Sequence, residues 1–490
     1  MSQKNRKKKE GINRRQFLRI AGMATAGAAV SSAAGCRGAG SGSADSLAGG
    51  EIEFTKETDA LVIGSGGAGL WATYELTKAG VSTLVVEKEP SWGGDTILAC
   101  GVLPVHGTVV QEQQGIEDLS PEETWEAYKE RYADARVPEL HKTVYLNAPR
   151  AINIWTEEFG VEWMPMDPDS YTKFFHIFAP GMQNDHLGFE KIYNFCAESN
   201  EFMFETRAMA FIIDQDDRPV GLRVRDEVTG EYTDIRFKKC LLATGDWVSN
   251  QEMIAKYLPS WTKAPAVTNA SMGEGIQMAQ ALGAETTSMD SVANLMSDFA
   301  PVVVWGFYES LIHVFPNGER ICNENAIFNA PGLAHEEGYT FWWSVFDEAL
   351  PEGYFKNSYQ TRAKRGNVVT ADTVEELAAK MMVPVETLKA TVEKYNTDAE
   401  AGEDTVFGKS FGFTPLKAPF YALKNRVVRY KTNGGLRIDK DCRVLNRFDE
   451  AIPNVYAAGS CQGETTPNVH DVSAIGMHAG QVMAAELTEE

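Results

Sequence analysis

Cysteine is scarce in this chain, and its spacing matches neither a metal site nor a haem attachment site. Seven cysteines occur among 490 residues. None forms CxxC or CxxCH, the spacings typical of zinc and iron–sulfur ligands, redox dithiols and c-type haem. We therefore expect no metal site and no covalent haem. Three cysteines in apolar runs, Cys240, Cys442 and Cys461, are predicted to be core thiols rather than disulfide partners.

Basic residues are also few compared with acidic ones. The chain has 46 Lys and Arg against 68 Asp and Glu, so its formal net charge is −22. Such an acidic surface repels nucleic-acid phosphates and anionic lipid headgroups, and we expect no nucleic-acid partner. The acidity suits a cationic or haem-bearing redox partner, or serves only solubility. Both interpretations stay open.

The N-terminus has a short, weakly apolar run (residues 20–35) behind a basic segment, in place of a run long enough to span a membrane. The pair Arg14-Arg15 precedes Phe17, a pattern that resembles a twin-arginine signal. We expect residues 1–35 to be a signal peptide that exports the folded protein. A disordered basic tail is the alternative.

Cys36 ends an Ala-Ala-Gly-Cys run that resembles a lipoprotein processing box, although Ala33 stands where Leu is usual. Residues 36–54 are rich in Gly and Ser and are predicted to be a flexible tether. Lipid anchoring at Cys36 and ordinary signal cleavage both stay open. Either one predicts a location in the periplasm or on the outer face of the cytoplasmic membrane, with no other membrane contact.

Glycine, in contrast, is placed with regularity after an apolar segment. Gly64, Gly66 and Gly69 give the spacing GxGxxG, and the next apolar segment ends in Glu87. These glycines allow a tight turn, a close approach of backbone to a pyrophosphate, and close helix–strand packing, while the acid accepts ribose hydroxyls. The helix N-terminus adds free N–H groups. The pattern predicts a Rossmann-like dinucleotide site, with a purely structural βαβ unit as the alternative.

Four further segments resemble the flavoprotein superfamily of FAD-dependent fumarate reductases and 3-ketosteroid dehydrogenases. Residues 93–96 are similar to a Gly-Gly run beside the flavin, and residues 244–246 to the turn after the returning strand. Residues 272–284 and 452–460 are similar to a helix and a ribityl-contacting segment of the same superfamily. The resemblance covers about residues 55–490 and implies FAD rather than NAD.

The glycine pattern and the resemblance together assign the FAD contacts. The expected residues are Gly64, Gly66, Gly67, Ala68, Gly69, Glu87, Lys88, Gly93, Gly94, Asp95, Thr96, Thr244, Gly245, Asp246, Gly459, Ser460, Ser473, Ala474 and Ile475. A helix starting near Ser473 should aim N–H groups at the flavin pyrimidine oxygens. We expect non-covalent FAD, because no histidine here clearly matches the one that carries the covalent link in the membrane fumarate reductases.

The resemblance implies an α/β fold with a discontinuous Rossmann-like FAD-binding domain, residues 55–295 and 430–490. An α+β substrate-capping domain, residues 296–429, is inserted between the two parts. Helical patterning over residues 373–395 begins with a capping-box-like start and is similar to the helical hairpin of that capping domain.

Most groups that bind a dicarboxylate in the fumarate reductases have no counterpart here. The position of the proton-donor arginine falls on Phe328, whose phenyl ring cannot donate a proton. The family's Thr-Glu pair falls on Val303 and Val304, and a histidine before a Gly-Gly turn falls on Lys431. We therefore predict a member that is not a fumarate reductase.

Apolar and aromatic side chains take the place of those groups and suit a flat, hydrophobic ligand. The predicted pocket residues are Trp247, Val303, Val304, Trp305 and Phe328. Relatives with such pockets act on steroids or aromatic acrylates. Trp342 and Trp343 either face this cleft or pack the core.

A proton donor other than arginine is then required. The candidate catalytic residues are the phenols Tyr308 and Tyr430, the amine Lys431, and His176 near a substrate-side histidine of the family. A structural role is the alternative for each, since a buried tyrosine usually bonds its hydroxyl locally and a histidine in an aromatic run usually packs.

These features predict an exported FAD-dependent reductase of an activated C=C bond, an enone or enoate, with hydride from flavin N5. No second nucleotide motif is present, so electrons are expected from a membrane cytochrome or a flavinylated carrier. Two alternatives remain: a ketone or steroid dehydrogenase running the reverse reaction, and a non-catalytic flavin electron-transfer lipoprotein.

Overall fold

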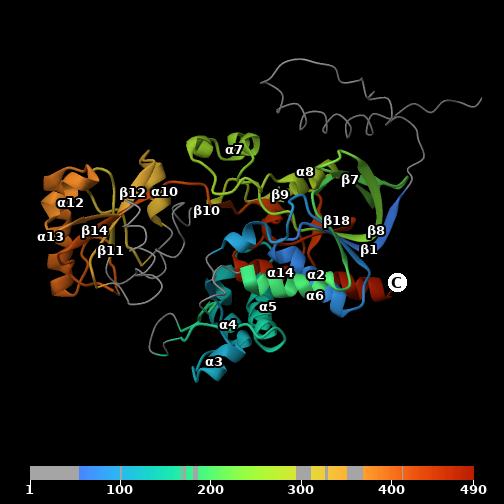
Figure 1. Cartoon of the computed structure of the whole chain (residues 1–490), viewed down its shortest axis with the longest axis horizontal. Helices are drawn as coiled ribbons and strands as arrows, with labels where there is room; N and C mark the ends of the chain where they lie inside the picture. Colours follow the sequence, from blue (N-terminus) through green and yellow to red (C-terminus); the bar gives the residue numbers. More distant parts are fainter. Residues whose placement is uncertain are drawn as a thin grey trace, which may run out of the picture.

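The computed structural model describes residues 54–99, 102–166, 168, 173–179, 186–293, 311–325, 329–349, 368–410 and 412–489. A large sheet with its helices lies at one end of the molecule, and a smaller sheet with helices of its own lies at the other (Figure 1). The predicted α/β class is confirmed by the parallel central strands of the large sheet.

The large sheet has the strand order β17-β18-β8-β1-β2-β5, with β6 and β7 extending from β8. Its strands are β1 (Lys56–Ile63), β2 (Thr83–Val86), β5 (Glu201–Met203), β6 (Thr206–Ile213), β7 (Pro219–Asp226), β8 (Tyr232–Leu242), β17 (Arg443–Leu445) and β18 (Ala451–Ala457). Strands β1, β2, β5, β8 and β18 pair in parallel. The last residues of β1 and β8 are apolar and buried, as expected for parallel strands covered on both faces. Because β18 pairs with β8, segments distant in the sequence share one sheet.

Helices cover this sheet and join its strands. They are α2 (Gly67–Lys78), α3 (Val109–Gln113), α4 (Pro121–Tyr128), α5 (Pro138–Glu157), α6 (His186–Ala197), α7 (Gln251–Tyr257), α8 (Glu274–Ala281) and α14 (Val469–Glu489). Short 3-10 turns are η2 (Gly94–Leu98), η3 (Lys129–Tyr132), η4 (Pro259–Lys263) and η5 (Gly459–Cys461). Small ladders are β3 (Val102–Pro104) with β4 (Phe175–Ile177), β9 (Thr286–Thr287) with β16 (Gly435–Leu436), and β10 (Val292–Ala293) with β15 (Lys431–Thr432).

Helix α14 packs unusually close to α2, which lies beside it in Figure 1. The contact depends on Gly476, where an added Cβ would lie 2.4 Å from the Ala68 carbonyl oxygen. Gly480 makes the same approach one turn later, 2.6 Å from the Ala72 oxygen. These glycines fix the start of α14 beside the glycine turn, and so they position the site described below.

The smaller sheet has the order β11-β12-β14-β13, and all its pairs are antiparallel. Its elements are β11 (Leu311–Val314), α10 (Asn329–Glu336), β12 (Phe341–Phe346), β13 (Val368–Ala371), α12 (Val374–Met381), α13 (Val385–Ala401) and β14 (Phe420–Arg426). The predicted helical hairpin is present as α12 and α13, and Thr373 caps α12 by accepting the Glu376 N–H at 3.1 Å. This sheet has a hydrophobic core of its own, whereas the exact domain boundaries stay predictions.

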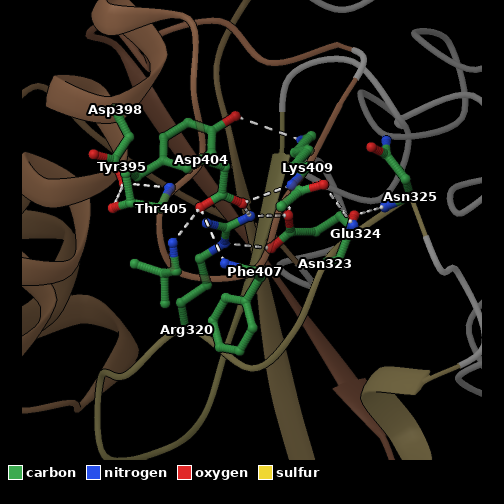
Figure 2. Close-up of polar contacts among 12 residues, drawn as sticks. Arg320, Asn323, Glu324, Asn325, Tyr395, Asp398, Asp404, Thr405, Phe407 and Lys409 are labelled. Atoms are coloured by element: carbon green, nitrogen blue, oxygen red, sulfur yellow. Dashed lines mark hydrogen bonds and ion pairs between the residues drawn. The ribbon is translucent and has the colours of Figure 1, made fainter.

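Four buried charges join the segment after β11 to the loop after α13 (Figure 2). Arg320 donates to Glu324 at 2.7 Å and to Asp404 at 2.8 Å. The Lys409 ammonium donates to the Leu311 carbonyl at 2.9 Å and lies 3.9 Å from the Glu324 carboxylate. Burial lowers the pKa of Lys409 to about 8. The four side chains are at most 7% exposed, so the buried charges balance, two positive against two negative.

The five described cysteines are all buried and free, which confirms the prediction of core thiols for Cys240, Cys442 and Cys461. Across the described ranges, no helix is long and apolar enough to cross a bilayer. The same residues include no group of three His, Cys, Asp or Glu side chains that could hold a metal ion.

Candidate functional site

A cavity of about 860 Å³ opens at the carboxyl ends of β1, β2 and β8. This is where open parallel sheets bind ligands, and its volume is in the upper range of ligand sites. Fourteen of the predicted cofactor residues line it: Gly64, Gly66, Gly67, Ala68, Glu87, Lys88, Gly94, Asp95, Thr96, Thr244, Gly245, Asp246, Gly459 and Ser460. The cavity therefore gathers segments that are far apart in the sequence.

Five predicted cofactor residues lie behind the wall of the cavity. Gly69 packs α2 onto the turn, because an added Cβ would lie 2.0 Å from the Gly64 oxygen. Gly93 donates its N–H to the Ser65 carbonyl at 3.0 Å. Ser473, Ala474 and Ile475 are fully buried in α14 and do not line the cavity.

The glycine turn leaves no room for larger residues. Gly64 has φ of +101°, and an added Cβ would lie 2.4 Å from the Ala243 carbonyl oxygen. The Gly67 N–H donates to Thr96 Oγ1 at 3.0 Å, which joins the start of α2 to the Gly-Gly segment. The first turn of α2 carries no acidic residue, so no carboxylate of the helix itself offsets its positive end. This arrangement suits a pyrophosphate.

Glu87 lies at the end of β2 and is nearly buried. Its Oε2 accepts from both the N–H and the Oγ of Ser65 at 2.8 Å, and its Oε1 accepts from the Glu89 N–H at 2.9 Å. Three donors therefore fix this carboxylate at the cavity wall. A carboxylate held in this way can accept from ribose hydroxyls, as the motif predicts.

Two charged residues of the wall, Arg207 and Glu274, were not among the predicted contacts. Lys88 pairs with Glu274 at 2.9 Å, and Arg207 contacts the same carboxylate. Glu274 directly follows Met272 and Gly273, which begin the helix motif of residues 272–284, so that motif could have predicted Glu274 in the cavity wall. Arg207 lies on β6, and no sequence pattern marked it.

Two aspartates, Asp95 and Asp246, join separate segments of the cavity wall by hydrogen bonds. Asp95 accepts from the hydroxyls of Thr268, at 2.7 Å, and Ser271. Asp246 accepts the N–H groups of Val248 at 3.0 Å and Thr432 at 2.8 Å. Burial raises the pKa of Asp246 to about 7.

Lys431 and Tyr430, two of the predicted catalytic residues, line the cavity. The Lys431 ammonium is nearly buried and donates to the Pro467 carbonyl at 2.7 Å and to Asn468 Oδ1 at 2.8 Å. Both acceptors lie directly before α14. A cation and the positive end of a helix thus lie together, and this combination favours an anion or a developing negative charge between them.

The predicted helix start near Ser473 is wrong by about one turn, because α14 begins at Val469. The Asn468 N–H donates to Asp471 at 3.2 Å, and the Ser473 hydroxyl bonds to the Val469 carbonyl as within a helix. Asn468 is the residue directly before α14, and its backbone carbonyl accepts the Val472 N–H at 2.8 Å as the first bond of the helix. The cavity is accordingly lined by Val469 and not by Ser473.

His176 and Trp247 lie in the core, contrary to their predicted roles. His176 is fully buried on β4, with Nε2 2.7 Å from Thr108 Oγ1, and burial lowers its pKa to about 4. Trp247 is fully buried and donates to the Gly434 carbonyl at 2.9 Å. Neither lines the cavity, because aromatic neighbours and hydrogen bonds to other segments of the chain hold both side chains in the core.

The remaining predicted substrate-side residues lie outside the described residues. They are Tyr308, Val303, Val304, Trp305 and Phe328. Trp342 and Trp343, whose placement was open, are 2% and 4% exposed and belong to the two hydrophobic cores. Their packing role is the one that the structure supports.

Residues 59–470 match the protein family described as FAD binding domain. The chain belongs to this family. Its cofactor is FAD, and the site fits that group, because the tight glycine turn, the fixed Glu87 and two helix N-termini surround one cavity of sufficient size. When bound, FAD would be held by these groups. The predicted flavoprotein superfamily is confirmed.

This FAD-binding protein is similar to curated oxidoreductases along most of its length. It is 26% identical over 445 residues to the probable fumarate reductase Ifc3 of Shewanella frigidimarina, covering 87% of this chain and 72% of the relative. It is 27% identical over 475 residues to the urocanate reductase of Eggerthella lenta, covering 88% and 75%. The solved 3-ketosteroid-Δ4-(5α)-dehydrogenase of Rhodococcus jostii superposes with a TM-score of 0.69 at 26% identity, covering 88% and 98%. The chain is an FAD-dependent oxidoreductase.

Proposed function

We propose that this protein reduces an activated C=C bond, an enone or enoate, in a largely apolar, aromatic or steroid-like substrate. FAD, when bound, supplies the hydride from N5. Reduction of such a bond builds negative charge on the activating carbonyl oxygen, and donors must already point toward it. The observation that carries the proposal is the nearly buried Lys431 ammonium beside the α14 N-terminus in the cavity wall.

Lys431 and Tyr430 are the substrate-side groups of this proposal. Lys431 is held by two oxygen acceptors, so its ammonium is fixed before a ligand arrives. A fixed cation stabilises an enolate-like oxygen without reorganisation. Tyr430 lines the same cavity and supplies a phenol that can donate a proton.

Fumarate is disfavoured as the substrate. A dicarboxylate needs donors for two carboxylates, and the position expected for the donor arginine holds Phe328. The relatives include reductases named for fumarate and for urocanate, and a dehydrogenase named for a ketosteroid. The family thus accepts substrates of different shape around one cofactor site, which supports a non-fumarate substrate here.

We also propose that electrons arrive from an external donor, a membrane cytochrome or a flavinylated carrier. The sequence carries a single GxGxxG motif, and that motif belongs to the cavity that fits FAD. Export by the twin-arginine route, with a possible lipid anchor at Cys36, remains part of this proposal. It depends on the sequence of residues 1–36 alone.

The test is an anaerobic reoxidation experiment. The holoprotein is reduced chemically, and visible flavin absorbance is followed while fumarate, urocanate, cinnamates or 4-en-3-one steroids are added. We expect rapid reoxidation by an aromatic or steroidal enone or enoate and none by fumarate. Reoxidation by fumarate alone would refute the substrate class. If none of the compounds reoxidised the flavin, the assignment as a reductase would be refuted.

The reverse reaction is the second candidate, supported by the likeness to the ketosteroid dehydrogenase. In that case a saturated ketone should bleach oxidised flavin under anaerobic conditions. The two directions are separated by comparing the rate of bleaching by the saturated ketone with that of reoxidation by the matching enone.

A further inference from the structure

A second cavity of about 270 Å³ adjoins the first and is used by nothing described so far. It lies among α4, η3, α5, the β3–β4 ladder and the start of α14. We call it the tyrosine cavity, after Tyr128, Tyr132 and Tyr145 in its wall. An apolar cavity of about 150 Å³ is enough for benzene, so this one has room for a single substituted aromatic ring.

The two cavities meet at Pro104 and His470, which line both of them. His470 belongs to the first turn of α14, next to the Asn468 oxygen that holds Lys431. A ligand in the tyrosine cavity would therefore lie one side chain away from the proposed reduction site. The Nδ1 atom of His470 is buried and has no hydrogen-bond partner among the described residues.

The walls of the tyrosine cavity suit a flat ring. Phe174 stacks on His106 with centroids 4.5 Å apart, and Tyr128 and Tyr145 stack at 6.2 Å. The Tyr132 and Tyr145 hydroxyls are 3.3 Å apart, and burial raises the pKa of Tyr145, which keeps its phenol protonated. Aromatic rings bind to such walls by stacked and edge contacts.

Two polar groups in the wall of the tyrosine cavity, His106 and Arg131, can form further hydrogen bonds with a ligand. His106 Nδ1 lies 2.8 Å from the Asp118 carboxylate, a contact that selects the tautomer with its proton on Nδ1 and leaves Nε2 as an acceptor. No described residue bonds to that Nε2. Arg131 lies over the Tyr128 ring at 4.4 Å, and no carboxylate of the described part of the chain pairs with its guanidinium.

An acceptor and a donor together match a hydroxyl group, which donates one hydrogen bond and accepts others. His106 Nε2 can accept from a phenolic O–H, and Arg131 can donate to the same oxygen. A carboxylate would match Arg131 but would face the Nε2 lone pair. The cavity therefore discriminates in favour of a hydroxylated ring.

We propose that the tyrosine cavity binds the hydroxyphenyl ring of the substrate, while the conjugated C=C bond reaches past His470 to Lys431. This inference rests on the proposed function and names its substrate class as hydroxyaryl enoates or enones. His106 is then a specificity-determining residue, and Asp118 positions it.

The experiment measures binding to oxidised holoprotein by calorimetry, with two ligands that contain no C=C bond. The ligands are 3-(4-hydroxyphenyl)propanoate and 3-phenylpropanoate, which differ only in the hydroxyl. We expect the hydroxylated ligand to bind about tenfold more tightly, as one well-placed hydrogen bond allows. His106→Phe keeps an aromatic ring against Phe174 but removes the acceptor, so the ratio should fall to within twofold. His478→Phe, on a surface turn of α14 away from both cavities, is the matched control and should keep the tenfold ratio.

Equal binding of the two ligands to the native protein would overturn the inference. A tenfold ratio in the His106→Phe variant would also overturn it, because another residue would then recognise the hydroxyl. Unchanged flavin absorbance spectra show that the variants are folded. Neither ligand can be reduced, so this test is independent of the reoxidation experiment. Tighter binding of the hydroxylated ligand, with no reoxidation by any compound tested, would refute the proposed function alone. Reoxidation by an enone or enoate, with equal binding of the two ligands, would refute this inference alone.

Discussion

Replacing Glu324 by glutamine should loosen the smaller sheet locally. Glu324 is 1% exposed and accepts from Arg320 and from the His313 N–H, within a cluster of two cations and two anions. The variant leaves Arg320 and Lys409 against Asp404 alone, so one buried positive charge loses its partner. Breaking a buried pair in this way costs about 3–5 kcal/mol.

Hydrogen exchange measured by mass spectrometry gives the local free energy of opening. A loss of about 3 kcal/mol corresponds to exchange about 100-fold faster. We expect that increase in peptides from β11 and from residues 404–410, with peptides from β1 unchanged. Glu201→Gln, in the exposed pair with Lys56, is the control and should change exchange little, because such pairs contribute about 0–1 kcal/mol.

A double variant separates charge balance from lost contacts. Glu324→Gln with Lys409→Met leaves Arg320 against Asp404, one charge of each sign, and should exchange at least tenfold more slowly than Glu324→Gln alone. Exchange that is unchanged in the single variant, or equally fast in both variants, would refute the reasoning from charge balance.

Three further outcomes follow from the site and its supports. Lys431→Met should lower the reoxidation rate by an enone by 100-fold or more, since one preorganised group contributes about 2.7–4 kcal/mol, and should also lower the flavin potential measured with reference dyes. Gly476→Val should separate α14 from α2, and purified protein should retain less FAD by absorbance. His176→Phe should make the free energy of unfolding depend less on pH below 6.5. In the folded protein the pKa of His176 is about 4, below its ordinary value, so its contribution to stability is complete above pH 6.5 and declines as the pH falls toward 4. Denaturant midpoints at pH 7 and pH 4.5 should therefore differ more for the native protein than for the variant.

The cofactor side of the site could be predicted because its signals are local. A tight turn at Gly64 and a fixed acceptor at Glu87 depend on a few neighbouring residues, and the structure places both in the cavity wall. The start of α14 lies about one turn before Ser473, because the helical bonds begin at the Asn468 carbonyl and no residue type fixes that point. The core position of His176 is not evident from the sequence either, because an aromatic run that lines a wall has the same composition as one that packs a core.

The charged groups that the sequence did not reveal come from distant segments. Asp404 joins Arg320 across 84 residues, and Arg207 joins Glu274 across 67. No periodicity marks such pairs, because each partner lies in an ordinary local context. The tyrosine cavity likewise combines four helical segments with the β3–β4 ladder, so only the fold brings His106 and Arg131 into one wall.

The pairing of β18 with β8 also has a consequence for biosynthesis. The cavity begins at the glycine turn after β1, but residues 459–472 complete its wall. A nascent chain therefore lacks part of the FAD cavity until residues 459–472 have left the ribosome. Tight binding of FAD should accordingly begin only after that segment has been synthesised, although β1 and its glycine turn emerge about 400 residues earlier.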